Sequence, residues 1–187
     1  MINPLKKHLE EIISIADDEF QVILNHFKIK KARKGDKLIE TGETGPNVFF
    51  VISGLLKLKY IDRDGKEVIV SFAMENWWES DFLAFYIGGR ATMCLQCIED
   101  TEVYSLSLEN YKRLCSHHSK MERFFLEKST KGHMASQQRI ISLITLKAQD
   151  RYDLLLSTYP TLVQRVSKSQ LASYLGVSRE TLSRFYA

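Results

Sequence analysis

The C-terminal segment carries the residue types and spacing that could do the most specific chemistry. Arg179 and Arg184 lie five positions apart, and Glu180 and Ser183 lie between them. An arginine can donate two hydrogen bonds to the O6 and N7 atoms of guanine, and a glutamate can accept one from N4 of cytosine. On the outer side of one helix, these four side chains could recognise base edges in the major groove of double-stranded DNA.

The residues around this segment predict the two helices that would position it. Ser167 followed by Gln170 is a capping-box pattern, which predicts a helix that begins there. That helix can run only to about Leu175, because Gly176 favours a turn with positive φ. Ser178 then predicts the cap of a second helix. The spacing is typical of a helix-turn-helix.

Charge is concentrated in the same region. The chain has 187 residues and a formal net charge of +3. Residues 162–187 contain four basic residues and one acidic residue, whereas the other 161 contain 22 of each sign. The small net charge of the whole chain therefore does not argue against nucleic-acid binding. Three cysteines, no apolar run of membrane-spanning length and no signal-peptide pattern indicate a cytoplasmic protein that does not bind membranes.

Upstream of the helix-turn-helix, the apolar patterning changes twice. Residues 5–27 have the spacing of an amphipathic helix, with a break near Asp17 and Asp18. From about 35 to 107, short β-rich runs alternate with turn residues, and Asp64-Gly65 is a hairpin signal. This section predicts a small antiparallel barrel or roll. Helical patterns return later, and we expect helices at 109–114, 119–147 and 150–158.

The segment from about Ser119 to Lys147 predicts a helix much longer than the average of about 11–12 residues. Such a helix either spans between two bodies or pairs with another chain. Polar residues interrupt its apolar seam near Lys128 to Lys131, which argues against an isolated coiled coil. We expect a dimerisation helix.

Several motifs resemble the Crp/Fnr family of bacterial transcription regulators. The segment from Gly176 to Arg184 is similar to that family's recognition helix. Weaker similarities to its cyclic-nucleotide-binding β-roll lie at Gly42-Glu43, 49–54, 64–67 and 99–103. The resemblance implies an α+β fold with three parts. These are an N-terminal antiparallel β-roll sensor with flanking helices in 1–115, a long connecting and dimerisation helix in 116–148, and a helix-turn-helix DNA-binding domain in 149–187.

The same resemblance implies a function and partners. It predicts a homodimer that binds a palindromic DNA operator, with Arg179, Glu180, Ser183 and Arg184 reading bases in a half-site of TGTGA type. It assigns contacts with the DNA phosphates to Ser167, Lys168, Ser169 and Ser178. It also implies RNA polymerase as a partner, without identifying the surface. Because the chain ends at Ala187, we expect a helix-turn-helix that lacks a complete wing.

The effector region departs from the family pattern. That pattern is Gly-Glu followed some ten residues later by Arg-Ser or Arg-Thr, which together hold the ribose and the cyclic phosphate. Alignment places Ser80-Asp81 on the first pair and Ala91-Thr92 on the second, so Arg90 falls one residue early. A one-residue offset on a strand turns a side chain to the other face. We therefore expect a degenerate pocket around Ser80, Asp81, Arg90 and Thr92 that does not bind cyclic AMP. Two alternatives remain: the protein binds another small-molecule effector, or it binds none. The sequence implies no cofactor.

Other interpretations compete with this one. Cys94 and Cys97 could ligate a metal or a cluster, and His117-His118 could ligate a metal or haem, but buried structural cysteines and a solvated helix start are favoured. A metal-dependent barrel enzyme would need histidines on its strands, and there is none between His26 and His117. We expect no enzymatic activity. The remaining alternative is a small-molecule sensing or scaffold module that does not read DNA specifically.

Overall fold

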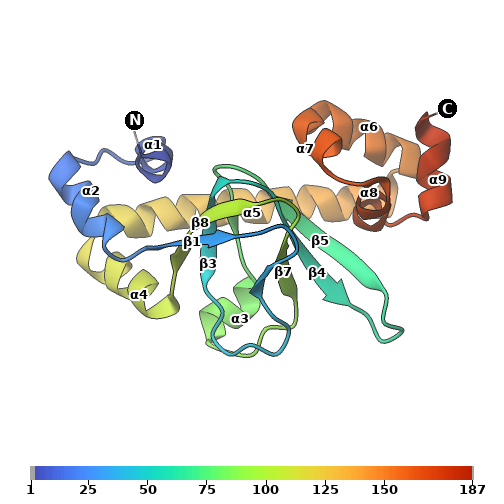
Figure 1. Cartoon of the computed structure of the whole chain (residues 1–187). Helices are drawn as coiled ribbons and strands as arrows, with labels where there is room; N and C mark the ends of the chain where they lie inside the picture. Colours follow the sequence, from blue (N-terminus) through green and yellow to red (C-terminus); the bar gives the residue numbers. More distant parts are fainter. Residues whose placement is uncertain (1–2, 187) are drawn as a thin grey trace.

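The structure is a computed structural model that describes residues 3–186 (Figure 1). Two short helices, α1 (Pro4–Glu10) and α2 (Asp17–Leu24), precede a β-roll. The helix α4 (Leu108–His117) follows the roll and leads into the long α5 (Ser119–Thr145), which runs behind the roll to the C-terminal helices. Within the described residues, no helix combines the length and the apolar character needed to cross a membrane.

The roll consists of two antiparallel sheets with the strand orders β1-β8-β3-β6 and β2-β7-β4-β5. The strands are β1 (Lys28–Ala32), β2 (Lys37–Ile39), β3 (Val48–Ser53), β4 (Leu56–Ile61), β5 (Glu67–Ala73), β6 (Trp78–Glu79), β7 (Cys94–Cys97) and β8 (Thr101–Leu106). The helix α3 (Phe82–Ile87) lies between β6 and β7. The predicted roll and the hairpin at Asp64-Gly65, which joins β4 to β5, are confirmed.

Three apolar cores hold the molecule together. One packs α1, α2 and the start of α5 against the roll, and its aromatic centre includes Phe50, Trp78 and Phe124. The second fills the inside of the roll. The third lies between the roll and the C-terminal helices, so it joins the two parts of the chain.

The C-terminal part consists of α6 (Ala148–Thr158), α7 (Pro160–Arg165), α8 (Lys168–Leu175), α9 (Arg179–Ser183) and the short 3₁₀ helix η1 (Arg184–Tyr186). The sequence patterns do not predict α7, because its six residues are too few for a periodic apolar pattern. Proline is tolerated in the first turn of a helix, where its missing N–H costs no hydrogen bond, and Pro160 occupies that place.

The N-terminal half differs from the sequence expectations in small elements. Residues 5–27 form two helices, and α2 begins at Asp17, where the break was expected. The strand β1 was not predicted, because it lies at a sheet edge and its residues are mostly exposed, so no apolar alternation marks it. The two-residue β6 and the six-residue α3 were also missed, since both are too short for a periodic pattern.

Candidate nucleic-acid interface

The helix-turn-helix is built by the caps that the sequence predicts. The Ser167 hydroxyl accepts a hydrogen bond from the Gln170 amide at 3.3 Å, and Gln170 Oε1 accepts one from the Ser167 amide at 3.0 Å. Gly176 ends α8 with φ of 68°. The Ser178 hydroxyl accepts from the Thr181 amide at 3.1 Å and so begins α9. The predicted capping box, turn and second cap are confirmed.

Apolar contacts fix the angle between the two helices. Ala172 and Leu175 of α8 and Leu182 of α9 are buried in the third core. Val177 donates its amide to the Ala172 carbonyl at 3.0 Å, which closes the end of α8 around Gly176. Arg151 of α6 donates two hydrogen bonds to the Leu175 carbonyl, at 3.1 and 2.8 Å. The helix α9 is therefore held rigidly on α8.

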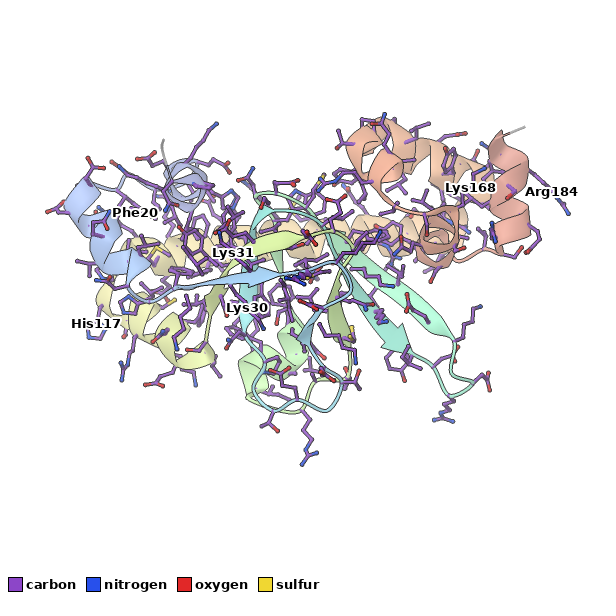
Figure 2. The ribbon with its side chains drawn as sticks, in the orientation of Figure 1. Phe20, Lys30, Lys31, His117, Lys168 and Arg184 are labelled. Carbon is purple, nitrogen blue, oxygen red and sulfur yellow. The ribbon has the colours of Figure 1, made fainter. Side chains whose placement is uncertain are left out.

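The structure places the four candidate base-reading residues together on the outer side of this unit. Arg179, Glu180, Ser183 and Arg184 are all exposed. Arg184 begins η1 directly after α9, and Figure 2 shows it at the C-terminal end of the molecule. Hydrogen bonds from its own backbone amide and from Ser178 lower the pKa of Glu180, which keeps this side chain an ionised acceptor.

The candidate phosphate-binding residues lie at the starts of the two helices. Ser167, Lys168 and Ser169 are exposed in the first turn of α8, and Ser178 is exposed at the start of α9. The positive end of a helix dipole favours an anion at these places. Ser167 and Ser178 also serve as caps, so their hydroxyls already hold the helix ends.

One basic residue of this region is not available to DNA in this structure. Arg165 makes ion pairs with Glu75 and Glu99, at 2.7 Å in both cases, and its side chain is only 25% exposed. The sequence count treated Arg165 as part of a basic C-terminal surface. The structure removes Arg165 from that surface, because two acidic residues of the roll neutralise its guanidinium.

The candidate effector residues are only partly brought together. Asp81 is buried and caps α3 by accepting from the Ala84 amide at 3.1 Å. Its other oxygen accepts from the Thr92 amide at 2.7 Å, the Thr92 hydroxyl at 3.1 Å and the Met93 amide at 3.1 Å. The Asp81 carboxylate therefore fastens α3 to the loop before β7.

The other two candidates point elsewhere. Ser80 is buried, and its hydroxyl donates to the Asn47 carbonyl at 2.9 Å. Arg90 is exposed and forms a backbone bridge with Thr44. The geometry thus joins Asp81 to Thr92 and leaves Ser80 and Arg90 with different neighbours.

A buried acid beside this region was missed at the sequence level. Glu79 of β6 is 6% exposed and accepts hydrogen bonds from the Ser71 hydroxyl at 2.6 Å and the Ser80 amide at 3.0 Å. Burial raises its pKa from about 4.5 to about 7. No local sequence signal marks this residue, because its burial depends on β5, which supplies Ser71.

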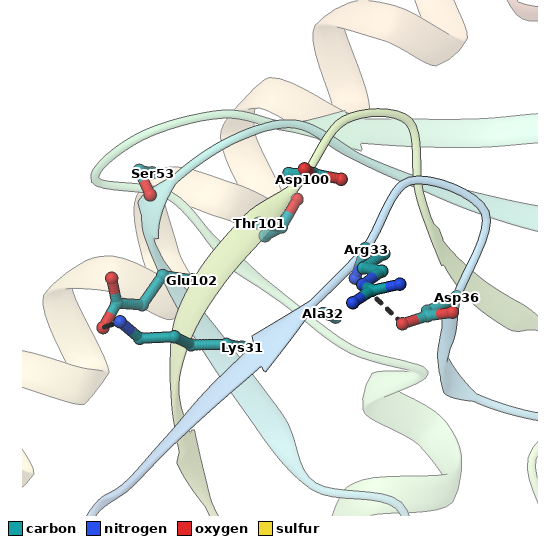
Figure 3. Close-up of a pocket in the computed structure, with 8 residues that line it drawn as sticks. All are labelled: Lys31, Ala32, Arg33, Asp36, Ser53, Asp100, Thr101 and Glu102. Atoms are coloured by element: carbon teal, nitrogen blue, oxygen red, sulfur yellow. Dashed lines mark hydrogen bonds and ion pairs between the residues drawn. The ribbon is translucent and has the colours of Figure 1, made fainter.

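Two cavities open on the outside of the roll. One of about 480 Å³ lies beside β1 and β8 (Figure 3) and is lined by Lys31, Ala32, Arg33, Asp36, Ser53, Asp100, Thr101 and Glu102. The other, of about 540 Å³, lies between the roll and the C-terminal helices and is lined by Lys34, Gly35, Lys57, Gln96, Cys97, Ile98, Glu99, Arg165, Ser167 and Gln170. Neither contains a predicted effector residue.

Among residues 3–186, no three or more histidine, cysteine, aspartate or glutamate side chains are grouped so that they could hold a metal ion. Cys94 and Cys97 are buried, and burial raises the pKa of both thiols. Both thiols are therefore weak nucleophiles at neutral pH. His117 lies at the end of α4, where Nδ1 is 2.8 Å from the Arg113 carbonyl oxygen.

Comparison with known proteins finds similarities both to a domain family and to whole transcription regulators. A family model described as a cyclic nucleotide-binding domain matches residues 29–118. The chain is 19% identical over 193 residues to the cAMP-activated global transcriptional regulator CRP of Haemophilus influenzae, covering 94% of this chain and 86% of the relative. It is 26% identical over 169 residues to the transcriptional regulatory protein btr of Bordetella pertussis, covering 84% and 69%.

Solved structures share the fold. FixK2 of Bradyrhizobium japonicum superposes with a TM-score of 0.75 at 17% identity, covering 86% of this chain and 82% of that one. The catabolite activator protein of Thermus thermophilus superposes with a TM-score of 0.61 at 21% identity, covering 96% and 84%.

A sensor roll, a long helix and a helix-turn-helix in one polypeptide define a class of transcription regulators that bind DNA. Within that class, the chain resembles regulators of the Crp/Fnr family along most of its length. The relatives are regulators rather than enzymes.

Proposed function

We propose that this protein is a dimeric regulator that reads a palindromic DNA operator through α9. The observation that carries the proposal is an exposed group formed by Arg179, Glu180 and Ser183 of α9 and by Arg184 at the start of η1. The Ser178 cap and the buried Leu182 hold α9 in place. The two arginines fit guanines, and Glu180 fits a cytosine. The family resemblance suggests a half-site of TGTGA type.

The long helix α5 supports dimerisation. After Phe125 it carries apolar side chains that the rest of the chain leaves uncovered. Met134, Ile141 and Ile144 are 55%, 59% and 77% exposed and recur at steps of seven and three residues. That spacing gives the helix an apolar face suited to the same helix of a second copy. A two-fold dimer would place two copies of α9 one DNA turn apart, about 34 Å.

The effector region supports a regulator that does not respond to cyclic AMP. The Asp81 carboxylate, which aligns with the family's ribose-binding acid, already accepts hydrogen bonds from Ala84, Thr92 and Met93. A nucleotide would have to break these bonds. Cyclic AMP should therefore leave the melting temperature unchanged, and an upward shift of several degrees would contradict this proposal. RNA polymerase as a partner rests on the family resemblance alone.

Two variants separate base reading from phosphate binding. Arg179→Ala should cost about 1–3 kcal/mol on the operator and relax the preference at one guanine position. Lys168→Ala should weaken binding to all sequences alike and make the salt dependence less steep. Fluorescence anisotropy on operators with single base changes measures both effects. If Arg179→Ala weakened every operator equally, α9 would not read bases through this residue.

A further inference from the structure

The surface between the roll and the C-terminal helices is a built interface. Leu55, Ile69, Phe72 and Ile98 of the roll share one core with the buried residues of α6–α9. Ser173 of α8 accepts a hydrogen bond from the Ile69 amide and donates one to the Glu67 carbonyl, both at 3.0 Å. The strand β5 is the edge of its sheet, so α8 covers polar backbone atoms that would otherwise be unpaired.

Arg165 completes this interface with a specific geometry. Its guanidinium donates to both oxygens of Glu75, at 2.7 and 3.0 Å, and to both oxygens of Glu99, at 3.0 and 2.7 Å. Glu75 lies in the turn between β5 and β6, and Glu99 lies in the turn between β7 and β8. We call the two carboxylates the Arg165 socket. A planar guanidinium bound on two sides is fixed in orientation as well as in position.

The socket is itself held by the roll. Glu75 also accepts from the Gly54 amide at 3.0 Å, so the β3–β4 turn supports it. Burial opposes ionisation of Glu75, but the hydrogen bonds from Arg165 and from backbone amides outweigh it, and the pKa of Glu75 is lowered. Two turns of the roll therefore bind Arg165 directly, and a third supports Glu75.

Arg165 is well placed to transmit orientation to α9. It is the last residue of α7, and Ser167, two residues later, caps α8. The helix α8 holds α9 through the Gly176 turn and the buried Leu182. A change in the direction of Arg165 would therefore move α8 and α9 together. Since Arg165 is neutralised by two acids, its role in this position is not to bind phosphate.

We propose that the Arg165 socket is the device by which the roll sets the orientation of the recognition helix, with Arg165 as a positioning residue for operator reading. This inference rests on the proposed function. Because Arg165, Glu75 and Glu99 bind one another, the socket should affect how α9 is oriented and should not affect which bases α9 prefers. It should determine how strictly the dimer requires two half-sites one turn apart.

The test compares Arg165→Gln with Arg113→Gln. Arg113 forms an exposed ion pair with Glu109, at 2.8 Å, and both residues lie on α4. This control therefore removes an arginine ion pair that does not connect the roll to the C-terminal helices. Affinity is measured by anisotropy on the operator with one-turn spacing and on versions lengthened by one and two base pairs. Arg165→Gln should lose about tenfold on the one-turn operator and little on the lengthened ones. The control should keep the spacing preference.

A second outcome of the same assay would overturn the inference. If Arg165→Gln weakened binding equally at every spacing and made the salt dependence less steep, Arg165 would be a phosphate contact. Glu75→Gln and Glu99→Gln provide milder variants if Arg165→Gln unfolds, because each keeps the side-chain shape and removes one charge. Arg165→Lys keeps the positive charge but lacks the paired donors of a guanidinium. Compared with Arg165→Gln, it should therefore recover more of the affinity than of the spacing preference.

Hydrogen exchange gives a readout that does not depend on DNA. In Arg165→Gln the Ile69 amide, which donates to Ser173, should exchange at least about tenfold faster, while β8 amides keep their rates. An unchanged exchange rate of the Ile69 amide would contradict the claim that the Arg165 socket holds α8 against the roll. If the wild type failed to distinguish the palindrome from a scrambled sequence, the proposed function would fail, and the exchange comparison would still decide whether the socket holds α8.

Discussion

At the scale of single residues, the sequence predicted best where chemistry is local. Ser167, Gly176 and Ser178 act on neighbours within three or four positions, and each has the predicted role. Arg165 could not be assigned in this way, because its partners Glu75 and Glu99 are 90 and 66 positions away. Only the folded roll brings their turns together. The basic C-terminal surface is correspondingly smaller than the sequence count suggested.

The buried Glu79 leads to a prediction on pH. Its folded pKa of about 7 lies above the ordinary value of about 4.5, so the folded state keeps a proton that the unfolded state releases. The free energy of unfolding should therefore fall as pH rises from about 4.5 to 7 and level off above that range. Over this range the loss attributable to Glu79 is on the order of 3 kcal/mol.

Glu79→Gln tests this assignment, because glutamine can still accept from Ser71 and does not titrate. Urea unfolding at pH 5 and pH 7.5 should show a variant whose stability relative to the wild type increases with pH. Other groups, such as the buried His8, are present in both proteins and cancel in the comparison. A difference between the two proteins that is the same at both pH values would show that Glu79 is ionised in the fold.

At the scale of elements, long and capped segments were predictable and short or exposed ones were not. The helix α5 was expected over 119–147 and spans Ser119–Thr145. The strand β1 was missed because edge strands need no apolar face, and α3 was missed because six residues are too few for a periodic pattern. Asp81, which the sequence alignment assigns to the effector pocket, caps α3 and accepts hydrogen bonds from Thr92 and Met93.

The uncovered face of α5 leads to a prediction on assembly. Ile144→Asp places a charge on that face and should convert a dimer into a monomer at micromolar concentration, because a buried unpaired carboxylate is costly. Ala135→Asp adds the same charge to an exposed position on the other side of the same helix and serves as the control. Light scattering coupled to gel filtration measures both masses. If the wild-type protein were itself a monomer at this concentration, the proposal that a dimer binds a palindromic operator would be contradicted.

At the scale of the whole molecule, the third core and the Arg165 socket make the roll and the helix-turn-helix one continuous body. The sequence predicted the order of the parts but not this contact, since residues from distant segments build it. Under the proposed function, this contact connects the roll to α9 through packed side chains, without a flexible linker.

The measurement that tests the central claim most directly is binding of the wild-type protein to a TGTGA palindrome and to a scrambled duplex of equal length. Gel shifts at about 50 and 200 mM salt separate base reading from phosphate attraction, because only the latter falls steeply with salt for both duplexes. We predict that the palindrome binds at least about 10³-fold more tightly at the higher salt. Equal affinity for the two duplexes would contradict sequence-specific reading by α9.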